Sequence, residues 1–378
     1  QLNHVRLLTR AIAVAFLSAA GCRRQEPIPE SAPHLEVSFL GDALLSQGVA
    51  IDSLEVGGLS ALSFSGEPPG WLALSDAHVP ARLFEMEVDF DESRLEVAAT
   101  KALPLRDGDD LDPEGLARCP WGNLFVSTEG ASRTEPIQQP KLLEFDAQGA
   151  LKRNFPIPEK FVVSGSPPEK GIRHNMGFES LGLSPDGTRL FVGVENTLHQ
   201  DGPMASFETA GFSRIIVYQV RERELSAYRE YVYTLGPFAA VPDFEGQEVF
   251  GGLVDMVALG NERLLALERV FIRELSGQKR DTTKARIYDV DLSEASDVSG
   301  ISSLAEEADW RPATKELVLD LDDILPMLSS EYPRLDNLEG MGLGPELPGG
   351  GKALLLVSDD NFQKKQRTQF LLFRLEGG

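Results

Sequence analysis

Cysteine is almost absent from this chain, which has Cys22 and Cys119 among 378 residues. A single possible pair cannot build the disulfide framework that stabilises small secreted domains, so a hydrophobic core must do so instead. Cys119 is followed by Pro120 and Trp121, and these apolar neighbours indicate a small buried hydrophobe, with a reactive thiol as the alternative. Histidine is also scarce: residues 4, 34, 78, 174 and 199 show no zinc-binding spacing.

Positive charge is in short supply as well. The chain has 36 Lys and Arg against 59 Asp and Glu, and its formal net charge is −23 at pH 7. General electrostatic attraction to nucleic acid or to an anionic membrane surface is therefore excluded, and we expect no nucleic-acid partner. The excess of acids favours cations as ligands.

The sequence signatures of several enzyme classes are missing. The chain contains no Gly-x-Ser-x-Gly nucleophile motif, no phosphate-cradling Gly-x-x-x-x-Gly-Lys-Ser/Thr loop, no dinucleotide fingerprint and no EF-hand loop. A calcium ion would therefore have to be bound by residues scattered along the chain.

No long hydrophobic run opens the chain. Arg6 and Arg10 precede an apolar run at 11–17 that is too short to span a bilayer, and small residues then lead to Cys22. The pattern resembles a bacterial lipoprotein signal. We therefore predict a signal peptide at 1–21, lipidation of Cys22, a polar tether at 22–34 and a folded domain at 35–378. An ordinary cleaved signal and a merely hydrophobic N-terminus are the alternatives. The prediction implies an exported protein of the bacterial cell envelope, periplasmic or at the outer membrane, that contacts the membrane only through its lipid.

Sustained helical periodicity is rare, and the stretch from Asn175 to Asn196 shows the pattern that replaces it. An apolar run reaches the turn SPDG at 184–187, and a β-rich run leaves it. Pro-Asp-Gly suits a tight reversal, so we predict a β-hairpin. Glu179 and Glu195 lie near its two ends. Antiparallel pairing should bring both carboxylates to one edge of the sheet.

The same order of strand, turn and strand returns along the chain. Units begin near Gly58, Gly115, Ser180, Leu253 and Gly340, and the fifth stops after three strands. We predict an all-β protein, a five-bladed β-propeller whose ring is closed by an N-terminal strand, 35–45, in the last blade. Six blades are the alternative if divergent strands hide one.

Two acidic positions recur when the units are aligned, one near the start of the first strand and one at the end of the second. The first set is Glu114, Glu179, Asp255 and Glu339, and the second is Asp76, Glu129, Glu195, Glu268 and Asp359. The first strand of a propeller blade lines the central channel, so these carboxylates should gather at one mouth of it. The predicted metal ligands are Glu114, Glu129, Glu179, Glu195, Asp255, Glu268, Glu339 and Asp359.

Crowded carboxylates raise one another's pKa unless cations or backbone donors compensate. A set of oxygen ligands suits a hard cation, so Ca²⁺ is the predicted cofactor. His174 is a candidate for proton transfer, with an ordinary surface histidine as the alternative. A structural role is the alternative for the acids, because a Glu-Gly pair can cap backbone N–H groups while glycine lets the chain bend.

Several stretches resemble a known family, the bacterial phytase-like proteins described as having esterase-like activity of phytase. They are GGLSALSF at 57–64, DPEGLA at 112–117, VSTEG at 126–130, NMGFESLGLSPDG at 175–187, LALER at 265–269, NLEGMGLGP at 337–345 and LLLVSDDNF at 354–362. Ser180 departs from the family, which more often has Gly after the glutamate. The resemblance implies an exported propeller. In the β-propeller phytases proper, calcium ions in an acidic channel bind substrate phosphate and activate water.

Together, residues and resemblance predict a lipid-anchored propeller that binds a divalent cation and hydrolyses a small anionic phosphoester or related ester. Glu179, Glu195 and His174 are the predicted catalytic residues, and Arg173, Asn175 and Arg269 the predicted substrate-binding residues. The alternative function is a non-enzymatic binding or scaffold propeller of the cell envelope.

Overall fold

The computed structural model describes residues 34–66, 70–90, 94–107, 111–276, 280–307 and 309–377. The predicted signal peptide, the lipidated Cys22 and the tether as far as residue 33 lie outside these described residues. Within them, no helix combines the length and the apolar character needed to cross a lipid bilayer.

Five four-stranded antiparallel sheets, here called blades 1 to 5, form the fold. Blades 1 and 2 consist of β4 (Leu59–Phe64), β5 (Trp71–Ser75), β6 (Arg82–Phe90) and β7 (Leu95–Pro104), and of β8 (Pro113–Arg118), β9 (Leu124–Thr128), β10 (Lys141–Phe145) and β11 (Leu151–Phe155). Blades 3 and 4 consist of β12 (Phe178–Leu183), β13 (Arg189–Val194), β14 (Gly211–Arg221) and β15 (Glu224–Leu235), and of β16 (Gln247–Ala258), β17 (Arg263–Glu274), β18 (Asp281–Asp291) and β19 (Thr314–Asp320). Blade 5 consists of β20 (Asn337–Glu346), β21 (Lys352–Asp359), β22 (Gln369–Glu376) and β1 (Glu36–Leu44).

The remaining elements are short. A two-stranded ribbon pairs β2 (Ala50–Ile51) with β3 (Leu54–Glu55). Three 3₁₀ helices are described: η1 (Glu159–Phe161), η2 (His199–Asp201) and η3 (Leu321–Met327).

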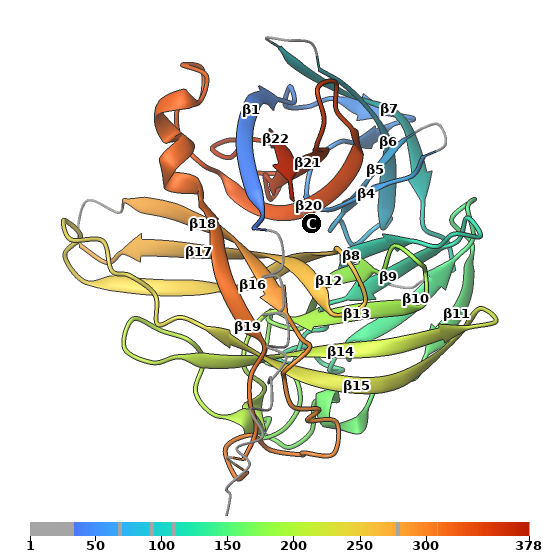
Figure 1. Ribbon diagram of the computed structural model, residues 1–378, viewed down its shortest axis with the longest axis vertical. Helices are drawn as coiled ribbons and strands as arrows, with labels where there is room; N and C mark the ends of the chain where they lie inside the picture. Colours follow the sequence, from blue (N-terminus) through green and yellow to red (C-terminus); the bar gives the residue numbers. More distant parts are fainter. Residues whose placement is uncertain are drawn as a thin grey trace, which may run out of the picture. The chain divides into compact units, whose positions relative to one another are not determined.

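The blades are arranged radially, with β4, β8, β12, β16 and β20 nearest the centre (Figure 1). These inner strands contact one another in a closed cycle, from β4 through β8, β12, β16 and β20 back to β4. The prediction of an all-β propeller with five blades is confirmed.

Strand β1 closes the ring as predicted. It pairs antiparallel with β22, from Glu36 opposite Glu376 to Leu44 opposite Gln369. The rings of Phe39 and Phe373 pack edge to face across this pair, with centroids 5.5 Å apart. One sheet therefore joins the two ends of the domain and leaves β22 without an open edge, which protects it from intermolecular pairing.

The hydrophobic core lies between neighbouring blades rather than at the centre of the ring. Strand β13 shows how: Leu190 and Val192 pack in a cluster with blade 2, whereas Phe191 packs with blade 4. Successive side chains of a strand point to opposite faces, and both faces of each blade are covered. This explains why many strands read as continuous apolar runs instead of alternating ones. Cys119 belongs to the same cluster as Leu190 and is buried, as predicted.

Candidate active site

Each inner strand has a β-bulge, which lies near the start of β4, β8, β12 and β20 but past the middle of β16. The register shifts between Leu59 and Ala61, Pro113 and Leu116, Phe178 and Ser180, Leu253 and Asp255, and Leu338 and Gly340. A bulge leaves a residue unpaired and re-aims its side chain. Glu114, Glu179 and Glu339 occupy the bulges of blades 2, 3 and 5.

The second acidic position follows the end of the second strand and is held by a repeated backbone hydrogen bond. The amide of Glu195 donates to the carbonyl of Gly177 at 2.9 Å, and the amide of Glu129 donates to that of Asp112 at 3.0 Å. In blade 1, the amide of Asp76 donates likewise to Gly58 at 2.7 Å. These bonds place the second acid of each hairpin beside the start of its inner strand.

Glycines give these acids room. A Cβ atom on Gly177 would lie 1.9 Å from the carbonyl oxygen of Glu129, and one on Gly252 would lie 2.2 Å from that of Glu195. Both distances are far below van der Waals contact, so no other residue fits without moving the acid. Gly177 lies just before β12 and Gly252 within β16, and each packs against the acid of the preceding blade, so each also sets the spacing of the carboxylates around the channel.

Carboxylates that are buried or half-buried thus collect at the channel. We call them the channel carboxylates: Asp76, Glu114, Glu129, Glu179, Glu195, Glu339 and Asp359. Burial is the largest cause that raises the pKa of each one, and the negative charges of neighbouring acids raise it further. The pKa of Asp76 and of Glu195 rises to about 7, and that of Glu129 to about 8. At neutral pH the group cannot be fully ionised without a compensating cation.

Two groups of acids, formed by channel carboxylates and Asp112, have the geometry of a cation site. Carboxylate oxygens of Glu129, Glu179 and Glu195 lie within 4.8 Å of one another, and so do those of Asp112, Glu114 and Glu129. Glu129 belongs to both groups and is 3% exposed. Its Oε1 is buried and has no hydrogen-bond partner. The same is true of Oδ1 of Asp76. Unpartnered carboxylate oxygens facing an all-oxygen set fit a hard divalent cation, which would supply the missing partner.

Arg269 supplies a positive charge to the channel carboxylates. Its guanidinium lies 2.7 Å from Glu339 and 3.8 Å from Glu195. Burial alone would lower the pKa of Arg269, but the attraction of these carboxylates raises it. Asn337 donates to Glu339 at 2.9 Å and to Asp359 at 3.4 Å. Glu339 and Asp359, both predicted metal ligands, therefore lie beside Arg269 and Asn337 instead of in the two cation-compatible groups.

Blade 4 departs from the predicted acid pattern because its acids are one residue out of phase. Phe178 pairs with Val194, the residue before Glu195, whereas Leu253 pairs with Glu268, the residue before Arg269. Arg269, not Glu268, is thus the equivalent of Glu195. By the same alignment Val254 occupies the position of Glu179.

The side chains of Asp255 and Glu268 accordingly have other partners. Asp255 accepts hydrogen bonds from the backbone amides of Met256 at 2.8 Å and Met341 at 2.6 Å. Glu268 accepts from the hydroxyl of Tyr233 at 2.8 Å and forms an ion pair with Lys315. The sequence prediction grouped both with the other metal ligands, but the structure does not, because an offset of one residue turns a strand side chain to the opposite face.

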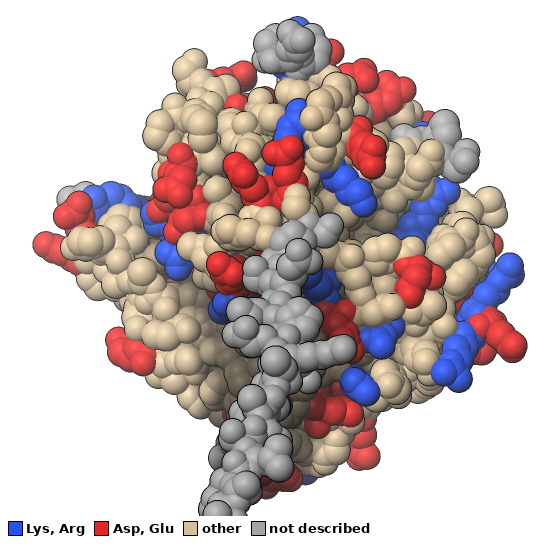
Figure 2. All heavy atoms as spheres, in the orientation of Figure 1, with Lys and Arg blue, Asp and Glu red and all other residues tan. Residues whose placement is uncertain are grey.

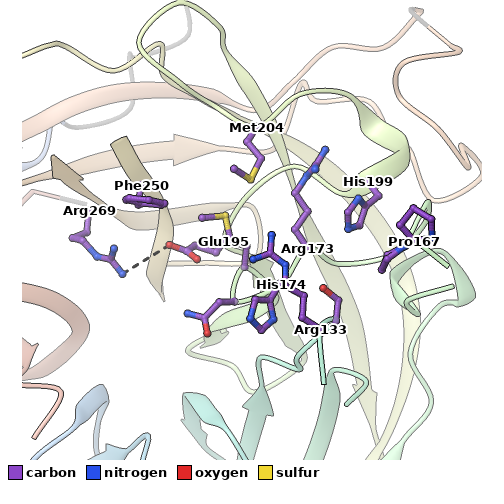
Figure 3. Close-up of a pocket in the computed structure, with 13 residues that line it drawn as sticks. Arg133, Pro167, Arg173, His174, Glu195, His199, Met204, Phe250 and Arg269 are labelled. Atoms are coloured by element: carbon purple, nitrogen blue, oxygen red, sulfur yellow. Dashed lines mark ion pairs between the residues drawn. The ribbon is translucent and has the colours of Figure 1, made fainter. Parts of the chain in front are cut away.

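A cavity of about 650 Å³ adjoins the channel carboxylates. Glu195 and Arg269 form one side of it, and the predicted substrate-binding and catalytic residues Arg173, His174 and Asn175 also line it. Figure 3 shows the ion pair between Arg269 and Glu195, with His174 and Arg173 on the other side of the glutamate. The predicted catalytic pair Glu195 and His174 therefore shares one cavity, whereas Glu179 reaches it only through its group with Glu195.

The basic side chains of the cavity, Arg173 and His174, differ in how they are held. Arg173 donates from Nε to the carbonyl of Thr197 at 2.9 Å and from Nη2 to that of Gly202 at 2.7 Å, so much of its guanidinium is committed to the backbone. Burial and the charge of Arg133 lower the pKa of His174, which keeps the imidazole neutral at pH 7. Its Nδ1 is buried and has no hydrogen-bond partner.

Sequence reasoning missed several residues of this site, among them Asp112, Arg133 and His199. Asp112 belongs to the second cation-compatible group, and its place two residues before Glu114 was an available signal. Arg133 and His199 line the cavity from segments that the strand alignment does not relate to the acids. Arg133 comes from an irregular segment and His199 from the three-residue helix η2, and both are too short to show a periodic pattern.

The chain belongs to the phytase-like family, described as having the esterase-like activity of phytase, which it matches over residues 54–362. The matched region contains all of the channel carboxylates and every residue that lines the cavity. Family and fold together define a propeller of hydrolase-like type.

Two individual proteins are more distantly similar. One, from Arthroderma benhamiae, is described as an uncharacterized secreted protein and is 26% identical over 151 residues, which cover 34% of this chain and 28% of that protein. The chain thus spans well under half the length of that relative. The other, a crystal structure of a candidate exo-beta-1,3-galactanase from Bifidobacterium bifidum s17, is 11% identical, with a TM-score of 0.35 over 90% of this chain and 92% of the other.

Proposed function

We propose that the protein is a divalent-cation-dependent hydrolase of small anionic phosphoesters or related esters, with Ca²⁺ as the cation. One observation carries this proposal: Glu195 belongs both to a cation-compatible carboxylate group and to the wall of an arginine-lined cavity. A ligand in that cavity would lie beside the cation and beside fixed positive charge. That combination is what ester hydrolysis at an anionic centre requires.

The residues of the chain have distinct roles in this proposal. Glu129, Glu179 and Glu195 hold the cation, with Asp112 and Glu114 as a second group around Glu129. When bound, the cation would supply charge stabilisation and lower the pKa of a bound water. Arg269 stays fixed by Glu339 and orients the anionic group of the substrate. Arg173 and Asn175 contact the substrate from the opposite side of the cavity.

Proton transfer falls to His174. In phosphoester hydrolysis the oxygen of water bonds to phosphorus, the bond from phosphorus to the leaving oxygen breaks, and a proton ends on the leaving alcohol. The neutral imidazole of His174, which lines the cavity, is suited to accept the proton of water and pass it on.

Two measurements test the proposal on the purified full chain. Calcium should raise the melting temperature, because a ligand that binds only the folded state at a thousand times its dissociation constant adds about 4 kcal/mol. A panel of phosphomonoesters, phosphodiesters and carboxylic esters should show calcium-dependent hydrolysis of at least one class, abolished in Glu195→Gln. Calcium binding without any hydrolysis, together with capture of a cell-envelope partner, would favour the non-enzymatic binding propeller.

The location of the protein is part of the proposal. We propose that it is exported and anchored through lipid on Cys22. The N-terminal residue pattern supports this, and the fungal relative described as secreted is in keeping with export. Expression of a Cys22→Ser variant followed by membrane fractionation tests the anchor. The variant should move to the soluble fraction; if it stays with membranes, the anchor is refuted.

A further inference from the structure

The cavity beside Glu195 has an apolar wall as well as a charged one. Met176, Met204, Phe250, Pro167 and Pro168 line it together with the arginines and histidines. Figure 3 shows Phe250 close to Arg269 and Glu195, and Met204 between Phe250 and Arg173 in this view. An anionic group held by Arg269 would thus have apolar side chains within reach of whatever it is attached to.

Two residues of the apolar wall lie outside the packed core. Met204 and Phe250 belong to none of the hydrophobic clusters that the described residues form between the blades, and both are partly exposed. Partly exposed apolar side chains that face a cavity are typical of ligand sites, in which a few polar groups fix the orientation of a mostly apolar ligand. The volume of about 650 Å³ is in the range of such sites.

The wall that carries Met204 is rigidly held. Asp201 in the same loop receives two hydrogen bonds from Arg214, at 2.6 and 2.9 Å, and both side chains are fully buried. Asn196 closes the loop, since its Oδ1 accepts from the amides of Thr197 at 2.8 Å and Ala205 at 3.2 Å. A wall fixed before the ligand arrives loses little conformational entropy when the ligand binds, which favours binding.

The positive charge of the cavity is too small for a polyphosphate. Of the three arginines that line the cavity, Arg269 is already paired with Glu339 and Arg173 is bonded to two backbone carbonyls, so Arg133 is the one without such a bond among the described residues. The visible part of the surface in Figure 2 shows Lys and Arg scattered among Asp and Glu, without a continuous basic area. Recognition of several phosphate groups normally requires a cluster of arginines or lysines. With two of its three arginines already engaged, the cavity suits one anionic group better than several.

We propose that the substrate is a phosphomonoester of an aromatic alcohol, with the phosphate against Arg269 and the cation-binding carboxylates and the aromatic ring against Phe250 and Met204. This inference rests on the proposed function for the hydrolytic step alone; the binding preference follows from the cavity. Hydrolysis of such an ester would release inorganic phosphate and the aromatic alcohol, whose oxygen takes up the proton.

Binding measurements test the preference for aromatic esters, and turnover measurements test the hydrolytic step. Isothermal titration of the full chain with CaCl₂ should show naphthalene-1-phosphonate, which water does not hydrolyse, binding at least tenfold more tightly than inorganic phosphate. Turnover of 1-naphthyl phosphate should exceed that of glycerol 3-phosphate at least tenfold in kcat/KM, and phytate should be the poorest of the three.

Variants of the apolar wall sharpen the test. Met204→Ala and Phe250→Ala should each weaken phosphonate binding several-fold and leave inorganic phosphate binding unchanged. Met327→Ala is the matched control, because Met327 is 55% exposed and lies on η3, which does not contribute to the cavity. It should change neither affinity.

Each outcome decides one claim. If the phosphonate binds no more tightly than phosphate, or phytate binds more tightly than both, the preference for aromatic esters is refuted, whether or not esters are hydrolysed. If the phosphonate binds tightly and depends on Phe250 and Met204 but no ester is turned over, the inferred ligand class stands and the hydrolase function fails.

Discussion

Glu129 is the residue on which the two cation-compatible groups converge. It shares one group with Glu179 and Glu195 and the other with Asp112 and Glu114, and one of its buried oxygens lacks a partner. A buried carboxylate among others destabilises the apo protein and becomes favourable only when a cation neutralises it. Its removal should therefore separate function from stability.

Glu129→Gln should lower calcium affinity at least tenfold and leave the melting temperature of the apo protein unchanged or higher, because the change removes one of several repelling charges. Calorimetric titration and thermal unfolding measure the two effects. A large loss of apo stability would show instead that Glu129 serves as a structural cap.

Glu268→Gln is the matched control, since Glu268 is equally buried but faces Tyr233 and Lys315. Loss of its charge leaves Lys315 without its partner and should cost about 1–3 kcal/mol of stability. Calcium affinity should not change. If Glu268→Gln lowered calcium affinity as much as Glu129→Gln does, Glu268 would take part in cation binding after all, and the conclusion that it faces away from the channel would be wrong.

The raised carboxyl pKa values predict how stability depends on pH. An acid with a higher pKa in the folded state binds more protons when folded than when unfolded, so the free energy of unfolding falls as pH rises between the two values. The window runs from the unfolded pKa of about 4 to the folded pKa of about 8 for Glu129. A pKa that is higher by one in the folded state changes the free energy of unfolding by about 1.4 kcal/mol across such a window.

The apo protein should therefore melt several degrees lower at about pH 8 than at about pH 5, while calcium should stabilise it more at the higher pH because protons compete with the cation for the carboxylates. Thermal unfolding with and without calcium across this window measures both effects. Apo stability that rises from pH 5 to 8 would contradict the burial of uncompensated acids.

At the scale of elements, one hairpin design repeats around the ring: a bulged inner strand pairs with a second strand that brings an acid to the channel, except in blade 4, where Arg269 takes the place of the acid. In blade 3 the turn is closed by Asp186, which accepts from the hydroxyl of Ser184 at 2.6 Å and from the amide of Thr188 at 3.0 Å. Gly187 there has a φ of +69°, a conformation that favours glycine. Gly252 of blade 4 then allows the backbone of β16 to pack closely against Glu195 at the end of this hairpin.

Gly252→Ala should disturb the site through the backbone. Its Cβ would meet the carbonyl oxygen of Glu195 at 2.2 Å, so the end of β13 must shift. We expect a loss of about 2–4 kcal/mol of stability, in the range of an overpacked buried site, together with weaker calcium binding. Chemical denaturation and calorimetric titration measure the two.

Gly260→Ala, in the turn of the same blade, is the control. A Cβ there would meet nothing within 4 Å, so stability and calcium affinity should be unchanged or slightly higher. Equal behaviour of the two variants would show that the close approach of Gly252 to Glu195 does not position the acid.

At the scale of the whole domain, the ring depends on one strand from the start of the chain. Blade 5 draws β20, β21 and β22 from the C-terminal end and β1 from the N-terminal end. Without β1, the backbone of β22 would have an unpaired edge, and apolar residues such as Phe373 would lose their cover. A propeller cannot redistribute that loss, because each blade packs only against its two neighbours.

A truncation that removes residues 1–45 should therefore melt at least ten degrees lower than one that removes 1–33, or should aggregate through the exposed edge. Thermal unfolding and size-exclusion chromatography distinguish these results. Equal stability of the two truncations would contradict ring closure by β1.

The strand alignment allowed the fold to be predicted from the sequence because each hairpin is a local unit with its own turn residues. Glu179 and Glu195 illustrate how far that reasoning extends: the prediction that they emerge at one edge follows from antiparallel pairing alone. In blade 4 the same reasoning chose residues one position away from those that face the channel, because the sequence does not show which residue forms the bulge. A bulge at Val254 turned Arg269 toward the channel and Glu268 away from it.

The amino-acid sequence by itself determined the all-β class, the five blades, the closing strand and most of the acids at the channel mouth, since these depend on period-two patterns and turn chemistry that act over short distances. Only the tertiary structure decided which acids share a cation-compatible group, that an arginine takes the acidic position in blade 4, and that Met204 and Phe250 face the same cavity as Glu195. Those facts depend on bulges, irregular loops and the packing of blade against blade, which bring together residues that no local pattern relates.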